Sequence, residues 1–352
     1  MARRFLFVLR TKLGDTLIHF QTVQAFAARH PRDEVWLLVR RDYAPLLGGE
    51  PAVRFVFFGN RAEMVAKLLW LRVAAQPFDA LAVLTGYGPV MLQVARLVRA
   101  SRRLFFDGRF PAAYPEHPAA YVETNLVDRS WQTARLLDPD LPKPTRLALP
   151  ALASRRAPRA ADQGPVGLVP LANELRKNMD AAAVAALVER VRVLHPGHPI
   201  WILLNPSDRG AAALLRAPLP AGVEVKRFRS LADLVPLCLE LGAWYGTDTG
   251  LYHLAVALGI PATVFFGPTQ PRLIVMPDQP AVTAVRLAAL GGAHCDEKSC
   301  ARPVCLNQAV AVWHGAQGAP RLDDTPVACP LRAAPADALV ANAIHENPRR
   351  QA

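Results

Sequence analysis

The chain has 352 residues, of which 52% are hydrophobic and 20% are charged, and its formal net charge at pH 7 is +12. This length is sufficient for two domains, and this composition excludes a chain that is disordered as a whole. The positive charge suits a nucleic acid, an anionic membrane surface or a phosphorylated substrate. Since the basic residues are dispersed and accompany no nucleic-acid-binding motif, we expect no nucleic-acid partner.

Apolar runs alternate with helical patterns through the first 150 residues. The predicted strands are 5–9, 35–39, 53–57, 80–84 and 103–106, and the predicted helices are 15–29, 62–74 and 90–99. This alternation predicts right-handed βαβ units and a parallel, doubly wound sheet. We assign residues 1–150 to an N-terminal Rossmann-like domain, followed by a linker at 151–165 that is rich in Pro, Ala and Arg.

The same alternation resumes after the linker. The predicted strands are 166–169, 200–204, 223–228, 243–245, 262–266 and 282–286, and the predicted helices are 180–194, 208–216, 231–241 and 249–258. Residues 166–333 are therefore expected to form a C-terminal Rossmann-like domain. Within the remaining residues, 334–352, a final helix is predicted over 334–345.

A polar turn with Lys12, Gly14 and Asp15 follows the first predicted strand and precedes a helix. Open parallel sheets bind ligands at the carboxyl ends of their strands, which is where this turn lies. Asp15 is therefore a candidate general base and Lys12 a candidate phosphate ligand, although an ordinary helix N-cap explains Asp15 as well. Thr85 and Gly86 follow another buried strand of this domain, and glycine there lets the backbone approach a ligand.

A second polar turn, Gly-Thr-Asp-Thr-Gly at 246–250, lies between a predicted strand and a predicted helix. Asp248 and Thr249 stand where they can cap this helix. The free N–H groups and the positive dipole end of such a helix favour a diphosphate. The turn therefore predicts either a diphosphate site or a helix cap without a ligand.

Together the two turns resemble the motifs of a known family. Residues 5–19, Phe-Leu-Phe-Val-Leu-Arg-Thr-Lys-Leu-Gly-Asp-Thr-Leu-Ile-His, are similar to the opening of the bacterial heptosyltransferases, the family-nine GT-B glycosyltransferases. Residues 230–271 resemble their most distinctive block, with Gly-Thr-Asp-Thr-Gly-Leu-Tyr-His-Leu-Ala-Val-Ala-Leu-Gly and then Phe-Phe-Gly-Pro-Thr-Gln-Pro. The resemblance implies a GT-B fold, in which two Rossmann-like, doubly wound parallel-sheet domains face a central cleft. In that family the final helix often crosses back to the first domain.

The resemblance also implies roles for single residues. Asp15 matches the catalytic aspartate, and Lys177 matches a basic residue that meets the donor phosphates, with Arg176 as the alternative. The implied donor-binding set is Lys177, Asp208, Asp248, Thr249, Gly250 and His253, and the acceptor-side set is Lys12, Gly14, Thr85 and Gly86. A histidine on a helix beside apolar residues is, without the motif, more often a packed core residue.

The chain departs from the family pattern at two places. The family usually has Ser or Thr before the lysine, where this chain has Pro-Leu-Ala-Asn at 170–173. It tends to have a glycine-rich stretch with a glutamate after the next strand, where this chain has Asn-Pro-Ser-Asp at 205–208. Asp208 therefore matches by position alone, and an N-cap role for Ser207 or Asp208 is an alternative. The nucleotide base of the donor stays open.

No segment of the sequence predicts a secretory signal or a membrane span. Arg3 and Arg4 lead directly into an apolar run, without the apolar segment and cleavage site of a signal peptide. The longest uncharged stretch, 249–270, is interrupted by Gly and Pro and therefore predicts a buried helix and a buried strand. We expect a cytoplasmic protein.

The cysteines predict no metal site. Cys295, Cys300 and Cys305 lack the close pairing of zinc ligands, Cys329 lies further on, and a cytoplasmic setting disfavours disulfides. Heptosyltransferases often carry a similar cysteine-rich loop after the Phe-Gly-Pro-Thr block. Cys238, inside an apolar helix, is expected in the core.

These observations favour an inverting glycosyltransferase. The resemblance implies an ADP-heptose-like donor, a lipopolysaccharide core or related anionic glycolipid acceptor, and a place at the inner face of the cytoplasmic membrane. The nucleotide-diphosphate sugar would be a substrate, no cofactor is expected, and the need for magnesium stays open. Two alternatives remain: a GT-B glycosyltransferase that uses another nucleotide sugar, and a non-catalytic nucleotide-sugar-binding protein of the same fold.

Overall fold

The computed structural model describes residues 2–86, 88–119, 124–156, 163–216, 218–287, 290, 304–315 and 341–343. The chain divides into two compact units. Unit 1 comprises Met1–Leu152 together with Arg272–Asp278, and unit 2 comprises Ala153–Pro271 together with Gln279–Ala352. Among the helices that the structure describes, none combines the length and the hydropathy that a membrane crossing requires.

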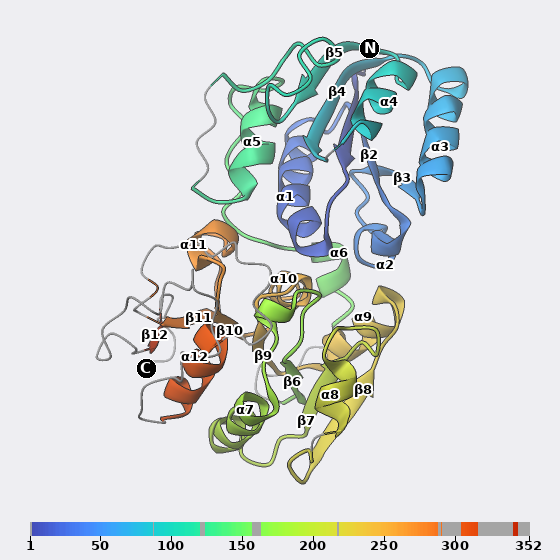
Figure 1. The fold of residues 1–352 in the computed structure, drawn as a ribbon. Helices are drawn as coiled ribbons and strands as arrows, with labels where there is room; N and C mark the ends of the chain where they lie inside the picture. Colours follow the sequence, from blue (N-terminus) through green and yellow to red (C-terminus); the bar gives the residue numbers. More distant parts are fainter. Residues whose placement is uncertain are drawn as a thin grey trace. The chain divides into compact units, whose positions relative to one another are not determined.

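Unit 1 is built on a five-stranded parallel sheet in the order β3-β2-β1-β4-β5 (Figure 1). Its strands are β1 (Arg4–Leu9), β2 (Glu34–Arg40), β3 (Arg54–Phe58), β4 (Phe78–Thr85) and β5 (Ala100–Phe105). Its helices are α1 (Leu13–Arg29), α2 (Ala44–Leu47), α3 (Arg61–Ala74), α4 (Val90–Leu97) and α5 (Val127–Arg135), with a 3-10 turn at Arg41–Tyr43. All five predicted strands and all three predicted helices are confirmed to within a few residues, whereas α2 and α5 were not predicted.

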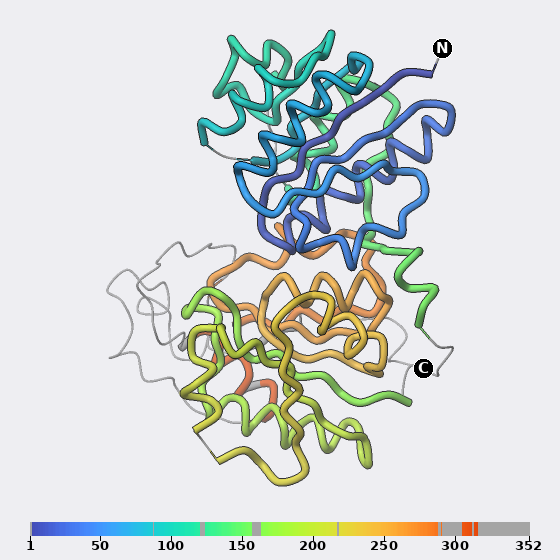
Figure 2. The backbone as a smooth tube through the Cα atoms, turned by 90° about the vertical axis from the view of Figure 1, so that its right-hand side faces the viewer, coloured from blue at the N-terminus to red at the C-terminus, as the bar shows by residue number. Residues whose placement is uncertain are grey.

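The central strand β1 is apolar and buried from Phe5 to Leu9, because helices cover both faces of the sheet. Leu6 and Val8 belong to one buried cluster with side chains of α3 and α4, whereas Phe5 and Phe7 contact Phe26 of α1, with ring centroids 4.9 and 5.1 Å apart. Alternate side chains of a strand point to opposite faces, so both faces need apolar residues. In Figure 2, β1 (dark blue) runs from near the N-terminus through unit 1.

Unit 2 has a seven-stranded sheet in the order β12-β11-β10-β9-β6-β7-β8, parallel except for β12. Its strands are β6 (Val166–Val169), β7 (Ile200–Leu204), β8 (Val223–Arg227), β9 (Ala243–Thr247), β10 (Ala262–Phe266), β11 (Val282–Leu287) and β12 (Ala341–Ala343). Its helices are α7 (Ala181–Leu194), α8 (Ala211–Arg216), α9 (Leu231–Glu240), α10 (Gly250–Ala257) and α12 (Val304–His314). Two short helices, α6 (Pro150–Ala153) and α11 (Pro271–Ile274), lie where the chain passes between the units.

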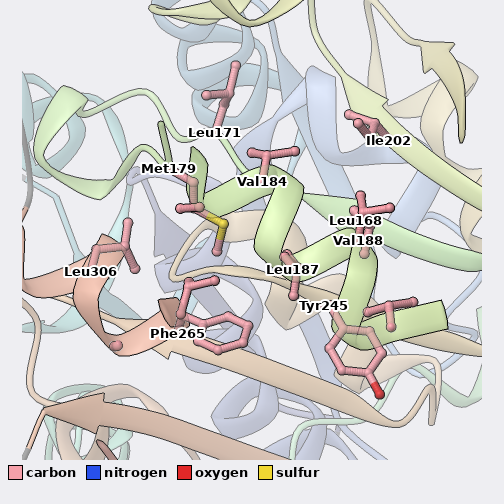
Figure 3. Close-up of a cluster of buried hydrophobic side chains, with 14 of the residues drawn as sticks. Leu168, Leu171, Met179, Val184, Leu187, Val188, Ile202, Tyr245, Phe265 and Leu306 are labelled. Carbon is pink, nitrogen blue, oxygen red and sulfur yellow. The ribbon is translucent and has the colours of Figure 1, made fainter. Parts of the chain in front are cut away.

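The core of unit 2 joins these strands to α7 and α12. Leu187 and Val188 of α7 belong to the same buried cluster as Ile202 of β7, Phe265 of β10 and Leu306 of α12 (Figure 3). The sheet fixes the carboxyl ends of β6, β9 and β10, where the polar turns lie. The capping box predicted from Ser230 and Asp233 is present at the start of α9.

The C-terminal prediction is wrong for residues 341–343. They form β12, which pairs antiparallel with β11, where the sequence predicts a helix. The edge of β11 offers unpaired backbone groups, and pairing with them overrides the weak intrinsic preference of an alanine-rich segment for helix. The rest of that predicted helix, residues 157–162 of the predicted linker, and Cys295, Cys300 and Cys329 lie outside the described residues.

Residues 272–278, which follow β10, belong to unit 1 rather than to unit 2. The buried amide of Asn125 donates hydrogen bonds to the carbonyls of Arg272 (3.0 Å) and Val275 (2.8 Å). The backbone N–H of Leu126 donates to Leu273 (2.7 Å). The chain therefore leaves unit 2, binds unit 1 through Asn125 and its neighbour, and returns for β11.

Candidate active site

In unit 1 the candidate residues gather at the carboxyl edge of β1 and β4. The chain connects β1 to strands on one side and then crosses to β4 on the other, so the ends of β1 and β4 form a topological switch point, where α/β sheets bind ligands. The backbone N–H of Arg10 donates to the carbonyl of Thr85 (3.2 Å) and joins the two turns. The acceptor-side set and the predicted base therefore share one edge: Lys12, Gly14, Asp15, Thr85 and Gly86.

Asp15 lies in the first turn of α1, and the N-cap of that helix is Lys12. The interpretation of Asp15 as an N-cap is therefore wrong, because α1 begins two residues before Asp15 instead of after it. The Thr11 hydroxyl donates to the Asp15 carboxylate (2.8 Å), and the Tyr43 phenol donates to the Thr11 carbonyl (3.0 Å). Asp15 is thus a half-buried carboxylate in a fixed orientation near the positive end of a helix dipole.

Thr85 and Gly86 shape the neighbouring turn. Thr85 is buried at the end of β4, and Gly86 has a φ of +155°. A Cβ at Gly86 would lie 2.8 Å from the sulfur of Met91, which is closer than real Cβ atoms approach. The positive φ favours glycine there, as expected of a turn that brings the backbone close to a ligand.

In unit 2 the switch point lies between β6 and β9. Here Lys177, in the 3-10 turn Leu175–Lys177 that follows β6, forms an ion pair with Asp248, directly after β9. The side chains are 18% and 6% exposed. Burial alone would raise the pKa of Asp248, but the Lys177 charge and the hydrogen bonds from Lys177 and Thr269 outweigh it and hold that pKa below its usual value. Asp248 is therefore a buried, ionised carboxylate.

Thr249 and Gly250 form the start of α10 beside this pair. The Thr249 hydroxyl accepts a hydrogen bond from the N–H of Leu251 (2.9 Å) and is the N-cap of the helix. The predicted capping role of Thr249 is thus confirmed, and Asp248 is the residue before the cap. α10 directs its positive end toward the carboxyl edge of the sheet, where an anion is stabilised.

His253 lies one turn further along α10 and is buried. Burial, reinforced by the Lys177 charge and opposed by Asp248, lowers the pKa of His253 to about 4, so the ring is neutral at neutral pH. Its ring centroid lies 4.1 Å from that of Tyr252, and its Nδ1 has no hydrogen-bond partner among the described residues. The donor-binding role of His253 stays a prediction.

Asp208 lies in the turn after β7, the strand next to β6 in the sheet. It does not take part in the ion pair between Lys177 and Asp248. The carboxylate is half-buried, and burial raises its pKa. Because α8 begins at Ala211, neither Ser207 nor Asp208 occupies the N-cap position, and that interpretation is wrong. Arg176, the alternative to Lys177, is bonded to Glu174 (2.9 Å).

Comparison with known proteins supplies the family. The model of glycosyltransferase family 9 (heptosyltransferase) matches residues 94–305, which is more than half of the chain. The chain belongs to glycosyltransferase family 9. Family membership makes the protein a glycosyltransferase and confirms the resemblance that the two turns carry. No curated protein matches the chain.

Solved structures of family 9 proteins share the GT-B fold of this chain. Heptosyltransferase WaaC of E. coli, solved with ADP, is 22% identical over 80% of this chain and 93% of its own, with a TM-score of 0.64. ADP-heptose lps heptosyltransferase II of E. coli is 19% identical over 88% and 98%, with a TM-score of 0.65. A family 9 glycosyltransferase of Veillonella parvula is 14% identical over 80% and 85%, with a TM-score of 0.64. At these sequence identities, the similarity to the three solved structures shows a shared fold only.

Two residues of the candidate site were not predicted from the sequence. Thr269 donates to Asp248, and its only signal was its place in the Phe-Gly-Pro-Thr segment. The buried Asn178 accepts from the N–H of Ala172 (2.7 Å) and donates to the carbonyl of Arg209 (2.6 Å), so it ties the turns after β6 and β7 together. No pattern in the sequence pointed to Asn178 beyond its position next to Lys177.

Within the described part of this family 9 chain, no group of three or more His, Cys, Asp or Glu side chains is arranged to hold a metal ion. Lys177 is paired with Asp248, the residue before the N-cap of α10. A helix N-terminus with an adjacent lysine can stabilise a diphosphate by itself.

Proposed function

We propose that the protein is an inverting glycosyltransferase that transfers a sugar from an ADP-heptose-like donor to a lipopolysaccharide core or related glycan acceptor. The observation that carries this proposal is the Lys177–Asp248–Thr269 cluster at the start of α10. It combines a half-buried cation, a helix N-terminus and small polar side chains at a switch point, which is what a nucleotide diphosphate requires. The presence of ADP in WaaC and of an ADP-2-deoxy-2-fluoro heptose in a second WaaC structure supports an ADP-linked donor.

Unit 2 would bind the donor. The N–H groups at Gly250 and the Lys177 ammonium would meet the diphosphate, which gains negative charge as it leaves the anomeric carbon. Thr249, Asp248 and His253 would line the same region, with Asp248 orienting Lys177 through the ion pair. Asp208, at the end of the neighbouring strand, would contact the nucleoside.

Unit 1 would supply the acceptor side. Asp15 would remove the proton from the acceptor hydroxyl as that oxygen attacks the anomeric carbon, in a single displacement that inverts its configuration. The Thr11 hydroxyl holds the Asp15 carboxylate in place. Lys12, Gly14, Thr85 and Gly86 would contact the acceptor, whose phosphates suit the exposed Lys12.

We place the reaction in the cytoplasm, at the inner face of the cytoplasmic membrane, where an anionic glycolipid acceptor would meet a protein with a net charge of +12. The donor is a substrate, and no resident cofactor is proposed. One observation favours a related alternative, a different nucleotide sugar: the turn after β7 is Asn-Pro-Ser-Asp, where family 9 tends to have a glycine-rich stretch with a glutamate.

The test is thermal unfolding of the purified protein with ADP, UDP, GDP or CDP, with and without magnesium. A ligand at a hundred times its Kd stabilises a protein by about 2.7 kcal/mol, a shift of several degrees for a domain of this size. The proposal expects a selective shift with ADP that is lost in Thr249→Ala and Lys177→Ala. Selectivity for UDP or GDP would replace the donor by another nucleotide sugar, and no shift with any nucleotide would contradict the donor site.

A further inference from the structure

Helix α3 of unit 1 has two apolar faces. Its inner face carries Met64, Leu68 and Leu71, which are buried in the core. Its outer side carries Leu69, Trp70 and Val73, which are 45%, 52% and 84% exposed. A helix on the surface of a globular domain needs one apolar stripe, so the second one requires a separate explanation.

The outer side chains are arranged as a continuous stripe. Ala62, Ala66, Leu69 and Val73 follow the spacing i, i+4, i+7, i+11, which places them on one face of a helix, and Trp70 adjoins them. Figure 1 shows α3 on the outer side of unit 1, next to α4. We call this set of five residues the outer stripe. It extends over the whole length of α3.

Basic residues border the outer stripe. Arg61 donates to Gln93 of α4 (3.3 Å) and Arg72 to the carbonyl of Arg96 (3.0 Å), so both arginines lie on the border toward α4. The helical spacing puts Lys67 on the opposite border. The exposed Arg99 lies three residues after Arg96, and its carbonyl accepts the N–H of Phe78, four residues after the end of α3, so it adds a further charge near this helix.

The acidic residue of α3 is neutralised by an ion pair. The sequence of α3 contains one acidic residue, Glu63, and its carboxylate is paired with Arg41 and accepts the N–H of Gly59 (2.7 Å). The outer stripe thus has a cationic border. This pattern fits an anionic lipid bilayer. An exposed tryptophan and aliphatic residues between cations suit the interface of such a bilayer. A second copy of the chain would instead bring borders of like charge together, which is unfavourable.

We propose that the outer stripe of α3, with the basic residues around it, docks the protein onto an anionic membrane surface. The inference rests on the proposed function, which places the reaction at a membrane, and deepens it by naming the surface of the protein that contacts the lipid. Trp70, Leu69 and Val73 enter the interfacial region, and Lys67, Arg72 and Arg99 meet the lipid phosphates.

The test is co-sedimentation of the full-length protein with vesicles that contain phosphatidylglycerol, compared with pure phosphatidylcholine vesicles, both without any glycolipid. The wild type is expected to bind the anionic vesicles in a salt-sensitive manner. Each cation near an anionic surface is worth about fivefold in affinity, so Lys67→Gln/Arg99→Gln should weaken binding about 25-fold. Leu69→Gln/Trp70→Gln/Val73→Gln should weaken it by at least about tenfold.

The matched control is Val193→Gln on α7, since Val193 is an apolar residue that is 70% exposed in unit 2. It should bind vesicles as the wild type does. All variants should keep the ADP-dependent thermal shift, which separates a failure of the docking surface from a failure of the donor site. Absence of wild-type binding, equal binding of the outer-stripe variants, or an equal loss in Val193→Gln would overturn the proposal. A dimer that only the outer-stripe variants dissociate would also overturn it, by assigning the surface to a second copy.

Discussion

Replacing Lys177 by methionine should invert the pH dependence of the stability of unit 2. Lys177 is the cation that holds the buried Asp248 carboxylate in its ionised form. Methionine keeps the length of the side chain and removes the charge. Removal of one partner of a buried ion pair typically costs about 3–5 kcal/mol, and because Thr269 continues to donate to Asp248 we expect the lower end, about 3 kcal/mol. For a domain of 150–250 residues this lowers Tm by roughly 6–12 °C.

The sign of the pH effect follows from proton linkage. In the wild type the pKa of Asp248 is lowered on folding, so its contribution to stability is present above the ordinary pKa of 3.8 and is lost as the pH falls below it. Without Lys177, burial dominates and raises this pKa above 3.8. The folded variant then binds more protons than the unfolded chain above pH 4, so its stability falls as the pH rises. Lys177→Met should therefore lose more Tm relative to the wild type at pH 8 than at pH 5.

The assay is thermal unfolding at several pH values for the wild type, Lys177→Met, Asp248→Asn and the double variant. The double variant should recover most of the loss, because it leaves no buried charge. A Lys177→Met protein with wild-type Tm and a parallel pH profile would refute the account of Asp248 as a buried carboxylate that depends on Lys177.

Two further predictions concern unit 1. Asn125→Ala leaves the buried carbonyl of Val275 and the part-buried carbonyl of Arg272 without their donor. The buried carbonyl alone should lower the free energy of unfolding by about 1–3 kcal/mol, measured in urea. A loss below about 0.5 kcal/mol would contradict the role of Asn125 in holding residues 272–278. Asp15→Asn removes the proposed base and should lower kcat by about 10²–10⁴-fold while the ADP-dependent thermal shift is retained; unchanged turnover would exclude Asp15 from the mechanism.

The sequence was sufficient for the fold because most of it follows from local patterns. The strands at the centre of both sheets consist largely of apolar residues, and the helices between them carry apolar faces, so β1, β6 and β10 were predicted to within a residue. The two polar turns follow the strands next to each switch point, and their residues were found for that reason. The same sequence pattern, a buried strand followed by a small polar turn, therefore predicted both the fold and the turns of the candidate site.

What the sequence did not predict depends on contacts between distant residues. The transfer of residues 272–278 to unit 1 depends on Asn125, about 150 positions earlier in the chain. The edge strand at 341–343 depends on β11, and its own composition favours a helix. The start of α1 at Leu13 was missed because Asp15 is a favourable N-cap residue, whereas the actual N-cap, Lys12, makes no side-chain capping hydrogen bond. In each case a tertiary contact or the exact end of a helix determines the observed structure, and the local sequence pattern predicts neither.

The central claim is best tested by a transfer assay with purified protein, ADP-heptose and a lipopolysaccharide core acceptor that lacks the added sugar. The account predicts release of one ADP for each sugar transferred, a product with inverted anomeric configuration, and release at least about 100-fold slower in Asp15→Asn. UDP- and GDP-sugars measured in parallel should give little product. Transfer with retained configuration, or transfer from ADP-heptose that is unaffected by Asp15→Asn, would contradict it.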